Sequence, residues 1–209
     1  MSTRRYFMRG CASGGGALAV LGLLAACGGG SDSGPDTNLV TPPLDNGSTS
    51  NQGQEWHMPD EAEAHKATWM AYGASTAIWT RAQVPQVQLA LARIANAIAA
   101  YEPVNMLVRQ SELENARQLL DPRVTLIPAK LDDLWMRDTG PVFVRKPNGE
   151  RACVKFNFNG WGKKQQFDHD SLVADVVSAH VKLPLLATRL VLEGGALEVD
   201  GKGTAIITE

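Results

Sequence analysis

From residue 56 onward, short apolar runs alternate along the chain with longer stretches in which apolar residues recur every three or four positions. The short runs are typical of strands, and the longer spacing is typical of one buried helix face. Strands are predicted at residues 67–72, 104–108, 124–127, 142–145, 152–158, 189–192 and 204–208. Helices are predicted at residues 84–98, from 111 to about 120, and from 170 or 171 through 177. This alternation predicts the α/β class.

Two of these helices carry candidate start signals. Ser111 and Glu114 have the spacing of a capping box, in which two side chains satisfy free amides at a helix N-terminus. Asp170 or Ser171 would cap the later helix. The order of elements is compatible with a doubly wound sheet, but no glycine-rich nucleotide loop follows an early strand. That fold would come without its usual ligand signature.

Residues 1–26, ahead of the folded region, have the layout of a secretory signal. They contain three arginines and no acid, and their final apolar stretch has 13 residues, whereas a membrane-spanning helix needs about 20. Residues 3–9, Thr-Arg-Arg-Tyr-Phe-Met-Arg, resemble a twin-arginine export motif. Residues 24–27, Leu-Ala-Ala-Cys, resemble a bacterial lipobox, so Cys27 is predicted to carry lipid and to anchor an exported periplasmic or cell-surface protein. The alternative is an ordinary cleaved signal with an incidental cysteine.

Residues 27–54 would hold the lipidated cysteine and a disordered linker, because small and polar residues dominate there and offer little apolar surface to bury. The globular domain follows at residues 55–209. Loss of the signal changes the formal charge from −2 to −5, which argues against a nucleic-acid partner. Cys11 would leave with the signal and Cys27 would take the lipid, so Cys153 would be the free thiol of the mature protein.

Four segments contain more polar, aromatic and glycine residues than a scaffold of strands and helices needs. They lie at residues 58–70, 132–141, 156–163 and 192–195. In this order they resemble the agmatine deiminase and bacterial peptidyl-arginine deiminase family, whose members modify guanidino groups. The resemblance extends over residues 56–209, and the chain departs from the family pattern at Ala62, Ala64 and the pair Tyr72-Gly73.

This resemblance implies a pentein-type α/β-propeller of five strand-and-helix modules around an acidic funnel, of which the chain would hold only part. It also implies hydrolysis of a guanidino C–N bond, in which a cysteine thiolate attacks the guanidinium carbon. A histidine transfers protons as ammonia leaves, and water then releases the product. Two aspartates bind the guanidinium nitrogens, as suits a planar cation with several N–H donors. No cofactor is implied.

Asp138 is the candidate for the first of these aspartates, because it follows Trp135 at the family's Trp-x-x-Asp spacing and precedes a Thr-Gly-Pro turn. Trp135 would provide an apolar or cation–π wall for the substrate. The alternative for Asp138 is a turn cap that pairs with Arg137 at the surface. Glu193 precedes two glycines and is a candidate substrate-contacting acid. Its alternative is a charge before a Gly-Gly bulge in an edge strand.

The remaining polar residues of these segments have structural interpretations as well. Asn157, Asn159 and Trp161 would rim the site or form a packed turn. Asp132 and Asp133 are interpreted as a solvated turn.

The histidines show no metal-ligand spacing, and no metal site is predicted. They are His57, His65, His169 and His180. His65 lies within the first family segment, where a scaffolding role is favoured over catalysis.

The family's Gly-His-x-Asp motif and its nucleophilic cysteine near the C-terminus are expected beyond Glu209. Cys153 is no substitute, because it lies in the middle of a predicted strand, where burial raises the pKa of a thiol and suppresses the thiolate. The 209-residue chain by itself is therefore predicted to be catalytically inactive. It would be the N-terminal part of a deiminase or the product of a truncated gene.

The leading functional prediction is an agmatine deiminase-like hydrolase, which converts agmatine and water to N-carbamoylputrescine and ammonia on the route to putrescine. The alternative is a peptidyl-arginine deiminase that acts on exported proteins. Absence of arginine between Arg151 and Arg189 favours an amine without a carboxylate, whereas export favours the protein substrate. A third hypothesis is a non-catalytic lipoprotein that binds cationic amines through Asp138 and Trp135.

Overall fold

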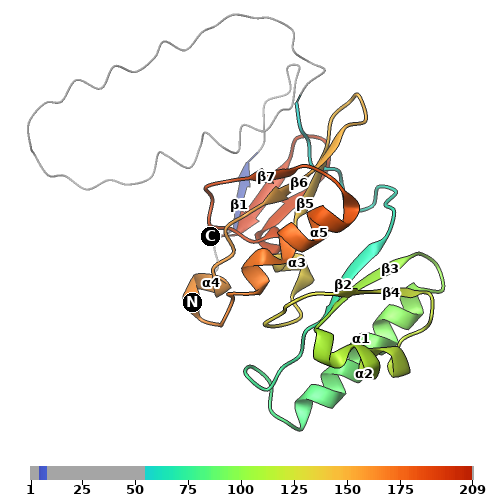
Figure 1. Ribbon diagram of the computed structural model, residues 1–209. Helices are drawn as coiled ribbons and strands as arrows, with labels where there is room; N and C mark the ends of the chain where they lie inside the picture. The colour runs from blue at the N-terminus through green and yellow to red at the C-terminus, as the bar shows by residue number, and fades with distance from the viewer. Residues whose placement is uncertain (1–4, 9–54, 209) are drawn as a thin grey trace, which may run out of the picture.

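The computed structural model describes residues 5–8 and 55–208, whose strands form three separate three-stranded sheets (Figure 1). The strands are β1 (Arg5–Met8), β2 (Thr68–Tyr72), β3 (Val104–Val108), β4 (Val124–Pro128), β5 (Val142–Arg145), β6 (Arg151–Lys155), β7 (Leu185–Ala187), β8 (Leu197–Val199) and β9 (Ala205–Thr208). The helices are α1 (Gln83–Ile98), α2 (Leu113–Leu119), α3 (Met136–Thr139), α4 (Gly160–Lys163) and α5 (Val173–Val181), and the 3-10 turns are η2 (Gln110–Glu112), η3 (Asp170–Leu172) and η4 (Gly194–Ala196). The α/β class is confirmed. The doubly wound alternative is wrong, because the described strands do not form one continuous sheet.

The first sheet has the order β2-β3-β4, and all its strands are parallel. Helices α1 and α2 cover one face, where Met106 and Val108 are part of the apolar core (Figure 1). On the opposite face, Leu107 packs in a second core with Val173 and Val177 of α5. Both faces are therefore buried, which explains why these strands are rich in apolar residues.

The second sheet begins with an antiparallel hairpin, β5 and β6, and α5 then leads to β7, which is parallel to β6. Gly149 in the hairpin turn has a φ of +88°, which glycine adopts without the strain that a side chain would bring. Val142, Val144 and Ala152 form the small core of this sheet.

The third sheet consists of the antiparallel pair β8 and β9, and the backbone of β1 pairs with the other edge of β9. β1 lies inside the predicted signal, in a stretch where the sequence pattern predicts no strand. The rest of that signal, Cys27 and the linker lie outside the described residues, so export and lipid anchoring stay predictions. Among the helices that the structure describes, none is both long enough and apolar enough to cross a bilayer.

Both predicted helix caps are wrong. Ser111 does not cap α2, which begins at Leu113 directly after the 3-10 turn η2. This corner is instead fixed by Arg109, whose Nε lies 2.8 Å from the Oε2 of Glu112. Neither Asp170 nor Ser171 caps α5: the Asp170 carboxylate accepts amide hydrogens from another loop, as described below, and the Ser171 hydroxyl donates to the carbonyl oxygen of Asp168.

Two predicted strands also differ from the structure. The strand predicted at residues 152–158 ends at Lys155, and residues 189–192 do not form a strand. The backbone N–H of Asn157 donates to the carbonyl oxygen of Leu190 at 2.9 Å, and its side-chain amide donates to the carbonyl oxygens of Thr188 and Leu190, at 2.9 and 3.0 Å. The sequence pattern does not predict β7 or β8, because three residues are too few to show a period of two.

Candidate functional site

Asp138 lies in α3, the helical turn that leads into β5, and its side chain is half-buried. Burial raises the pKa of this carboxyl, while a hydrogen bond from the backbone of Gly195 and the charge of Arg137 lower it. The ion pairs of Arg137 are made with Glu61 and Glu198 rather than with Asp138. The predicted surface pair is therefore wrong, and the Asp138 carboxylate can accept hydrogen bonds from a further partner.

Glu193 immediately precedes η4, which packs against α3. Burial raises the pKa of the Glu193 carboxyl, and the negative charge of Asp138 raises it further. Glu193 lies outside the strands, so the alternative of an edge-strand bulge is wrong. The structure thus brings together two half-buried acids that are 55 residues apart in sequence.

The two glycines after Glu193 make this approach of η4 to α3 possible. A Cβ atom on Gly194 would lie 2.6 Å from the carbonyl oxygen of Arg137. A Cβ atom on Gly195 would lie 2.1 Å from Oδ1 of Asp138. A side chain at position 194 would therefore force the two turns apart, whereas one at position 195 would displace the Asp138 carboxylate.

Trp135 directly precedes α3, the turn that holds Asp138, and presents an aromatic ring at the surface. Its side chain is 42% exposed, and its ring packs edge-on against Trp161 with 6.3 Å between ring centroids. Trp161 also packs edge-on against the buried ring of Phe158, at 5.0 Å. A partly exposed indole face is the surface that a cation needs for a cation–π contact.

The loop around Trp161 is a packed turn that also contacts the candidate site. Asn159 accepts a hydrogen bond from the backbone N–H of Gly162 at 2.7 Å, so it acts as a turn cap. Trp161 has a φ of +54°, a left-handed conformation that a bulky residue rarely adopts. Asn157 is bound to the segment of Thr188, as described above. Of the three candidates in this loop, Trp161 is the one that contacts Trp135.

Asp132 and Asp133 are not a solvated turn, because their exposed fractions are 6% and 1%. Their backbone N–H groups donate to the two carboxylate oxygens of Asp170, at 2.8 and 3.1 Å. The carboxylate of Asp132 in turn accepts from the backbone N–H groups of His169 and Asp170, at 2.6 and 3.1 Å. The two loops therefore cap each other.

Burial raises the pKa of Asp170 to about 6, and the charges of Asp132 and Asp133 contribute to the increase. The two backbone donors lower this pKa but do not offset the cost of burial. A buried carboxylate that lies close to two others is costly to ionise.

Arg109 is a second residue whose role the sequence did not reveal. Its guanidinium donates to the carbonyl oxygens of Gly73, Ala74 and Leu131, at 2.8, 2.5 and 3.0 Å. It thereby ties the end of β2 to the loop before α3. An arginine directly after a buried apolar strand is a weak sequence signal for such a clamp, because charged residues are common at strand ends.

A hollow of about 720 Å³ lies at the carboxyl ends of β3 and β4. Its lining includes Arg109, Lys130 and His169, and neither Asp138 nor Glu193 belongs to it. The hollow is therefore distinct from the pair of acids.

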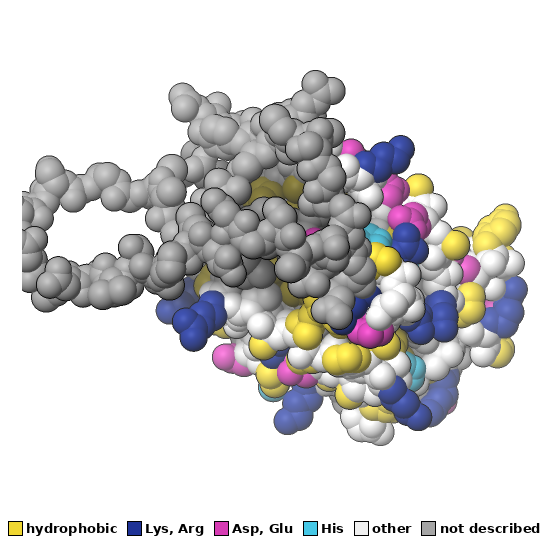
Figure 2. Space-filling model, turned by 90° about the horizontal axis from the view of Figure 1, so that it is seen from above, with side chains coloured by type: hydrophobic (Ala, Val, Ile, Leu, Met, Phe, Trp, Pro, Cys, Tyr) yellow, Lys and Arg dark blue, Asp and Glu magenta, His cyan; other side chains and the backbone are white. Residues whose placement is uncertain are grey.

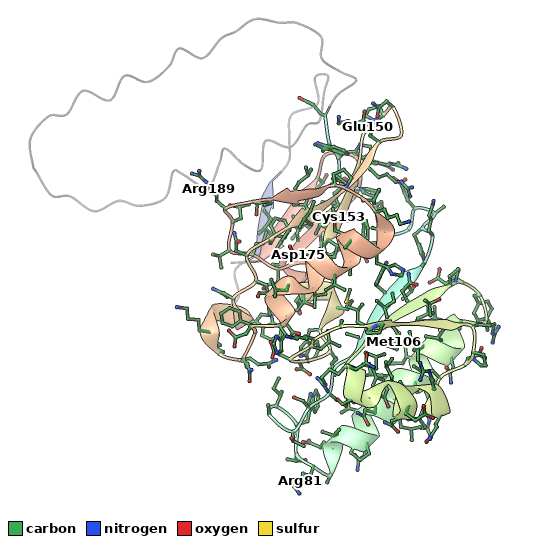
Figure 3. All side chains as sticks on the ribbon, viewed as in Figure 1. Arg81, Met106, Glu150, Cys153, Asp175 and Arg189 are labelled. Atoms are coloured by element: carbon green, nitrogen blue, oxygen red, sulfur yellow. The ribbon has the colours of Figure 1, made fainter. Side chains whose placement is uncertain are left out.

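Cys153 lies on β6 in the second sheet, next to α5 (Figure 3). Its side chain is fully buried, and burial raises the pKa of its thiol, although a hydrogen bond with Ser178 lowers it slightly. The predicted setting of this cysteine is confirmed. Cys11 and Cys27 lie outside the described residues.

His65 connects the first family segment to the residues just before β3. Its Nε2 lies 2.5 Å from the Oε2 of Glu102, and the Thr68 hydroxyl donates to the other oxygen of that carboxylate. The carbonyl of Glu63 and the Glu102 carboxylate both raise the pKa of His65. These contacts fit a scaffolding role.

Ion pairs are spread over the exposed surface around these segments. Arg145 pairs with Glu63 at 2.5 Å, and Lys146 pairs with Glu150 at 2.6 Å. Figure 2 shows basic and acidic side chains interspersed on the visible part of one face. Surface pairs of this kind contribute little to stability.

Comparisons with known proteins match the same part of the chain. Residues 57–209 match the Porphyromonas-type peptidyl-arginine deiminase family. The chain is 37% identical over 161 residues to the agmatine deiminase of Pseudomonas fluorescens, covering 74% of this chain and 44% of that protein. It is 36% identical over 183 residues to the agmatine deiminase of Ectopseudomonas mendocina, covering 83% of this chain and 46% of that protein.

Among solved structures, the agmatine deiminase of Enterococcus faecalis is similar with a TM-score of 0.66 and 34% identity, over 70% of this chain and 41% of that one. The chain therefore spans less than half the length of the relatives that it matches. The family match includes Asp138, Glu193 and Trp135 together with the loops that hold them. This chain belongs to the Porphyromonas-type peptidyl-arginine deiminase family.

Proposed function

We propose that this chain provides the guanidinium-binding part of an agmatine deiminase-type hydrolase. The observation that carries the proposal is the packing of α3 against η4, which brings Glu193 to the turn that holds Asp138, so that the charge of Asp138 raises the pKa of the Glu193 carboxyl. A cation placed between the two carboxylates would relieve their repulsion. Guanidinium is the cation that suits them best, because its planar N–H groups match carboxylate oxygens in pairs.

Trp135 would form the wall of this site. Its exposed indole face can contact the delocalised charge of a guanidinium, and the packing of Trp161 against it keeps water from one side. Burial of the two acids strengthens their attraction for a bound cation, because the effective dielectric constant falls away from bulk water. The three side chains together would orient the guanidinium carbon toward an attacking group.

The complete protein would be a five-module propeller, with the three sheets of this chain as successive modules. A repeat within the chain supports this proposal. The helical turn α3 leads into the antiparallel pair β5 and β6, and the helical turn η4 leads into the antiparallel pair β8 and β9. The two turns pack against each other. Asp138 lies in α3, and Glu193 lies directly before η4.

The reaction would convert agmatine and water to N-carbamoylputrescine and ammonia. A thiolate would add to the guanidinium carbon, ammonia would leave, and water would release the product and regenerate the thiolate. Cys153 is unsuitable as this nucleophile because it is buried and its thiol pKa is raised. We therefore expect the 209-residue chain alone to bind the substrate without turning it over.

A peptidyl-arginine deiminase is the second candidate, favoured by the description of the matched family and by the predicted export signal. A lipoprotein anchored through Cys27 would meet proteins outside the cytoplasm rather than metabolites inside it. A non-catalytic amine-binding lipoprotein would use the same acids. The three candidates differ in which ligand binds and in whether the complete protein releases ammonia.

Calorimetry with the 209-residue chain tests the proposal. We expect agmatine to bind more tightly than a blocked arginine peptide, and ammonia release from agmatine to be undetectable. Asp138→Asn should weaken agmatine binding by roughly 30-fold, because a charge-assisted pair is lost. Glu114→Gln removes an exposed acid of α2 and should leave binding unchanged.

Three results would count against parts of this proposal. Tighter binding of the peptide would favour the peptidyl-arginine candidate. Absence of agmatine binding would overturn the guanidinium site. Ammonia release by this chain would show that its catalytic residues are already present.

A further inference from the structure

Asp133 is one of the most deeply buried charged residues in the described part of the chain, with 1% of its surface exposed. Its carboxylate accepts hydrogen bonds from three side chains. Oδ1 accepts from Nε1 of Trp79 at 2.8 Å, and Oδ2 accepts from Nε1 of Trp135 at 2.7 Å. Oδ2 also accepts from Nε2 of Gln165 at 3.1 Å. One carboxylate thus joins two indole rings and the loop that follows Trp161.

The backbone of Asp133 is held as firmly as its side chain. Its N–H donates to the buried carboxylate of Asp170, and Arg109 binds the carbonyl oxygen of the nearby Leu131. Gly73 packs directly on the Asp133 carbonyl, since a Cβ atom on Gly73 would lie 1.8 Å from that oxygen. The carboxylate is therefore a fixed point to which the Trp135 indole is attached.

The ring of Trp135 needs such an attachment. It is 42% exposed, and it packs against Trp161 with the two ring planes nearly perpendicular. A half-exposed side chain has few packing contacts to select one rotamer, so a hydrogen bond to a buried charge becomes the main restraint on its orientation.

We propose that Asp133 is a positioning residue, which holds the Trp135 ring in the orientation that binds a guanidinium beside Asp138. This inference rests on the proposed function, because it takes Trp135 as the wall of the guanidinium site. Asp133 itself does not contact the ligand. It acts through the indole N–H of Trp135, while the bond to Trp79 anchors the same carboxylate to the loop that precedes α1.

Three matched variants distinguish a role of Asp133 in positioning the Trp135 ring from a role in the stability of the fold. Asp133→Asn keeps the shape of the side chain but offers one acceptor oxygen where there were two, so an indole N–H loses its partner. Trp135→Phe removes the indole N–H together with part of the ring system, and keeps a smaller aromatic face. Trp79→Phe removes the other indole donor to the same carboxylate, leaves the bond to Trp135 in place, and is the control.

The first measurement is the position of the ring, by nuclear Overhauser contacts between the side chains of Trp135 and Trp161 in the 209-residue chain. We expect these contacts in the wild-type chain and in Trp79→Phe, and their loss in Asp133→Asn. The second measurement is calorimetric affinity for agmatine. Asp133→Asn should weaken binding about tenfold, and Trp79→Phe should change it less than about twofold.

A double-mutant cycle completes the test. In the Trp135→Phe background, Asp133→Asn should have little further effect on agmatine affinity, because the bond through which it acts is already absent. Retention of the Trp135–Trp161 contacts in Asp133→Asn would overturn the inference, whether or not agmatine binds. Should Asp133→Asn fail to fold, Trp135→Phe alone decides: unchanged ring contacts and unchanged affinity would overturn it. Failure of the wild-type chain to bind agmatine would overturn the proposed function instead.

Discussion

The parallel sheet β2-β3-β4 and the junction of α3 with its neighbouring loops are both buried, but by different means. In the sheet, Met106, Leu107 and Val108 are fully buried among apolar side chains on both faces. At the junction, the buried groups are carboxylates, and Asp133 and Asp170 accept N–H groups from several directions. Apolar burial is non-directional, whereas hydrogen bonds depend on distance and angle. We expect the sheet to determine stability and the junction to determine the geometry of binding.

Met106→Ala should have the largest effect on stability and would test this division directly. Met106 is fully buried at the centre of the first sheet, so its truncation leaves a cavity and should lower the free energy of unfolding by about 3 to 4 kcal/mol. Urea denaturation measures this loss. Calorimetry at a temperature where the variant is folded should show unchanged agmatine affinity. A fall of more than about threefold would contradict the separation of the two regions.

Asp170→Asn should change how stability depends on pH. The pKa of Asp170 is raised to about 6, so its contribution to stability is largest below its unfolded pKa near 4 and is lost as pH rises through 6. Relative to Asp170→Asn, the wild-type free energy of unfolding should fall by at most about 3 kcal/mol between pH 4 and pH 7. Urea denaturation of both chains at several pH values measures this difference. A constant offset would show that Asp170 does not titrate in this range.

The Met106→Ala chain provides the comparison for that experiment. Its destabilisation comes from lost apolar contacts and should be the same at each pH. A pH-dependent loss in this variant would mean that the sheet and the carboxylates are coupled.

Gly73→Ala should disturb the junction through the backbone. The added methyl would meet the Asp133 carbonyl oxygen at 1.8 Å, so the loop must move, at a cost of about 2 kcal/mol. Agmatine affinity and the Trp135–Trp161 contacts should both decrease. Gly149→Ala is the control, because it costs about 1 kcal/mol through its positive φ and meets no atom within 4 Å. Equal effects of both variants on affinity would contradict the role of the Gly73 contact.

Gly195→Ala should have the smallest effect on stability and act mainly on binding. Its methyl would lie 2.1 Å from Oδ1 of Asp138, and that side chain can rotate away at small cost to the fold. Loss of its orientation should weaken agmatine binding about tenfold, or about 1.4 kcal/mol. Binding that stays at the wild-type level would show that Asp138 is not a ligand of the cation.

Several elements could be read from the sequence because a local pattern encodes them. Strands β3 and β5 have the predicted bounds, and α1 follows the apolar residues at helical spacing. Short strands are not predicted as well from the local pattern. A strand is predicted at residues 189–192 where none forms, and β7 and β8 are not predicted. At three or four residues, pairing with a neighbour decides which segment becomes a strand.

The candidate site was found by motif, but its environment was not. Asp138, Glu193 and Trp135 were identified by their place in the family segments, and the structure brings the two acids together. Asp132 and Asp133 were misread as solvated because adjacent aspartates usually lie at the surface. Apart from Trp135, which lies two residues from Asp133, their donors come from residues 79, 165, 169 and 170, at separations that no local pattern reveals.

The sequence by itself determined the α/β class, most of the strands, the family and the three side chains of the candidate site. Tertiary structure alone decided which acids are buried, which caps form, and what holds the Trp135 ring. Apolar periodicity is a local property of the chain, so it survives in the sequence. The ionisation and orientation of a carboxylate depend on the donors and charges packed around it, and here those come from loops that only folding brings together.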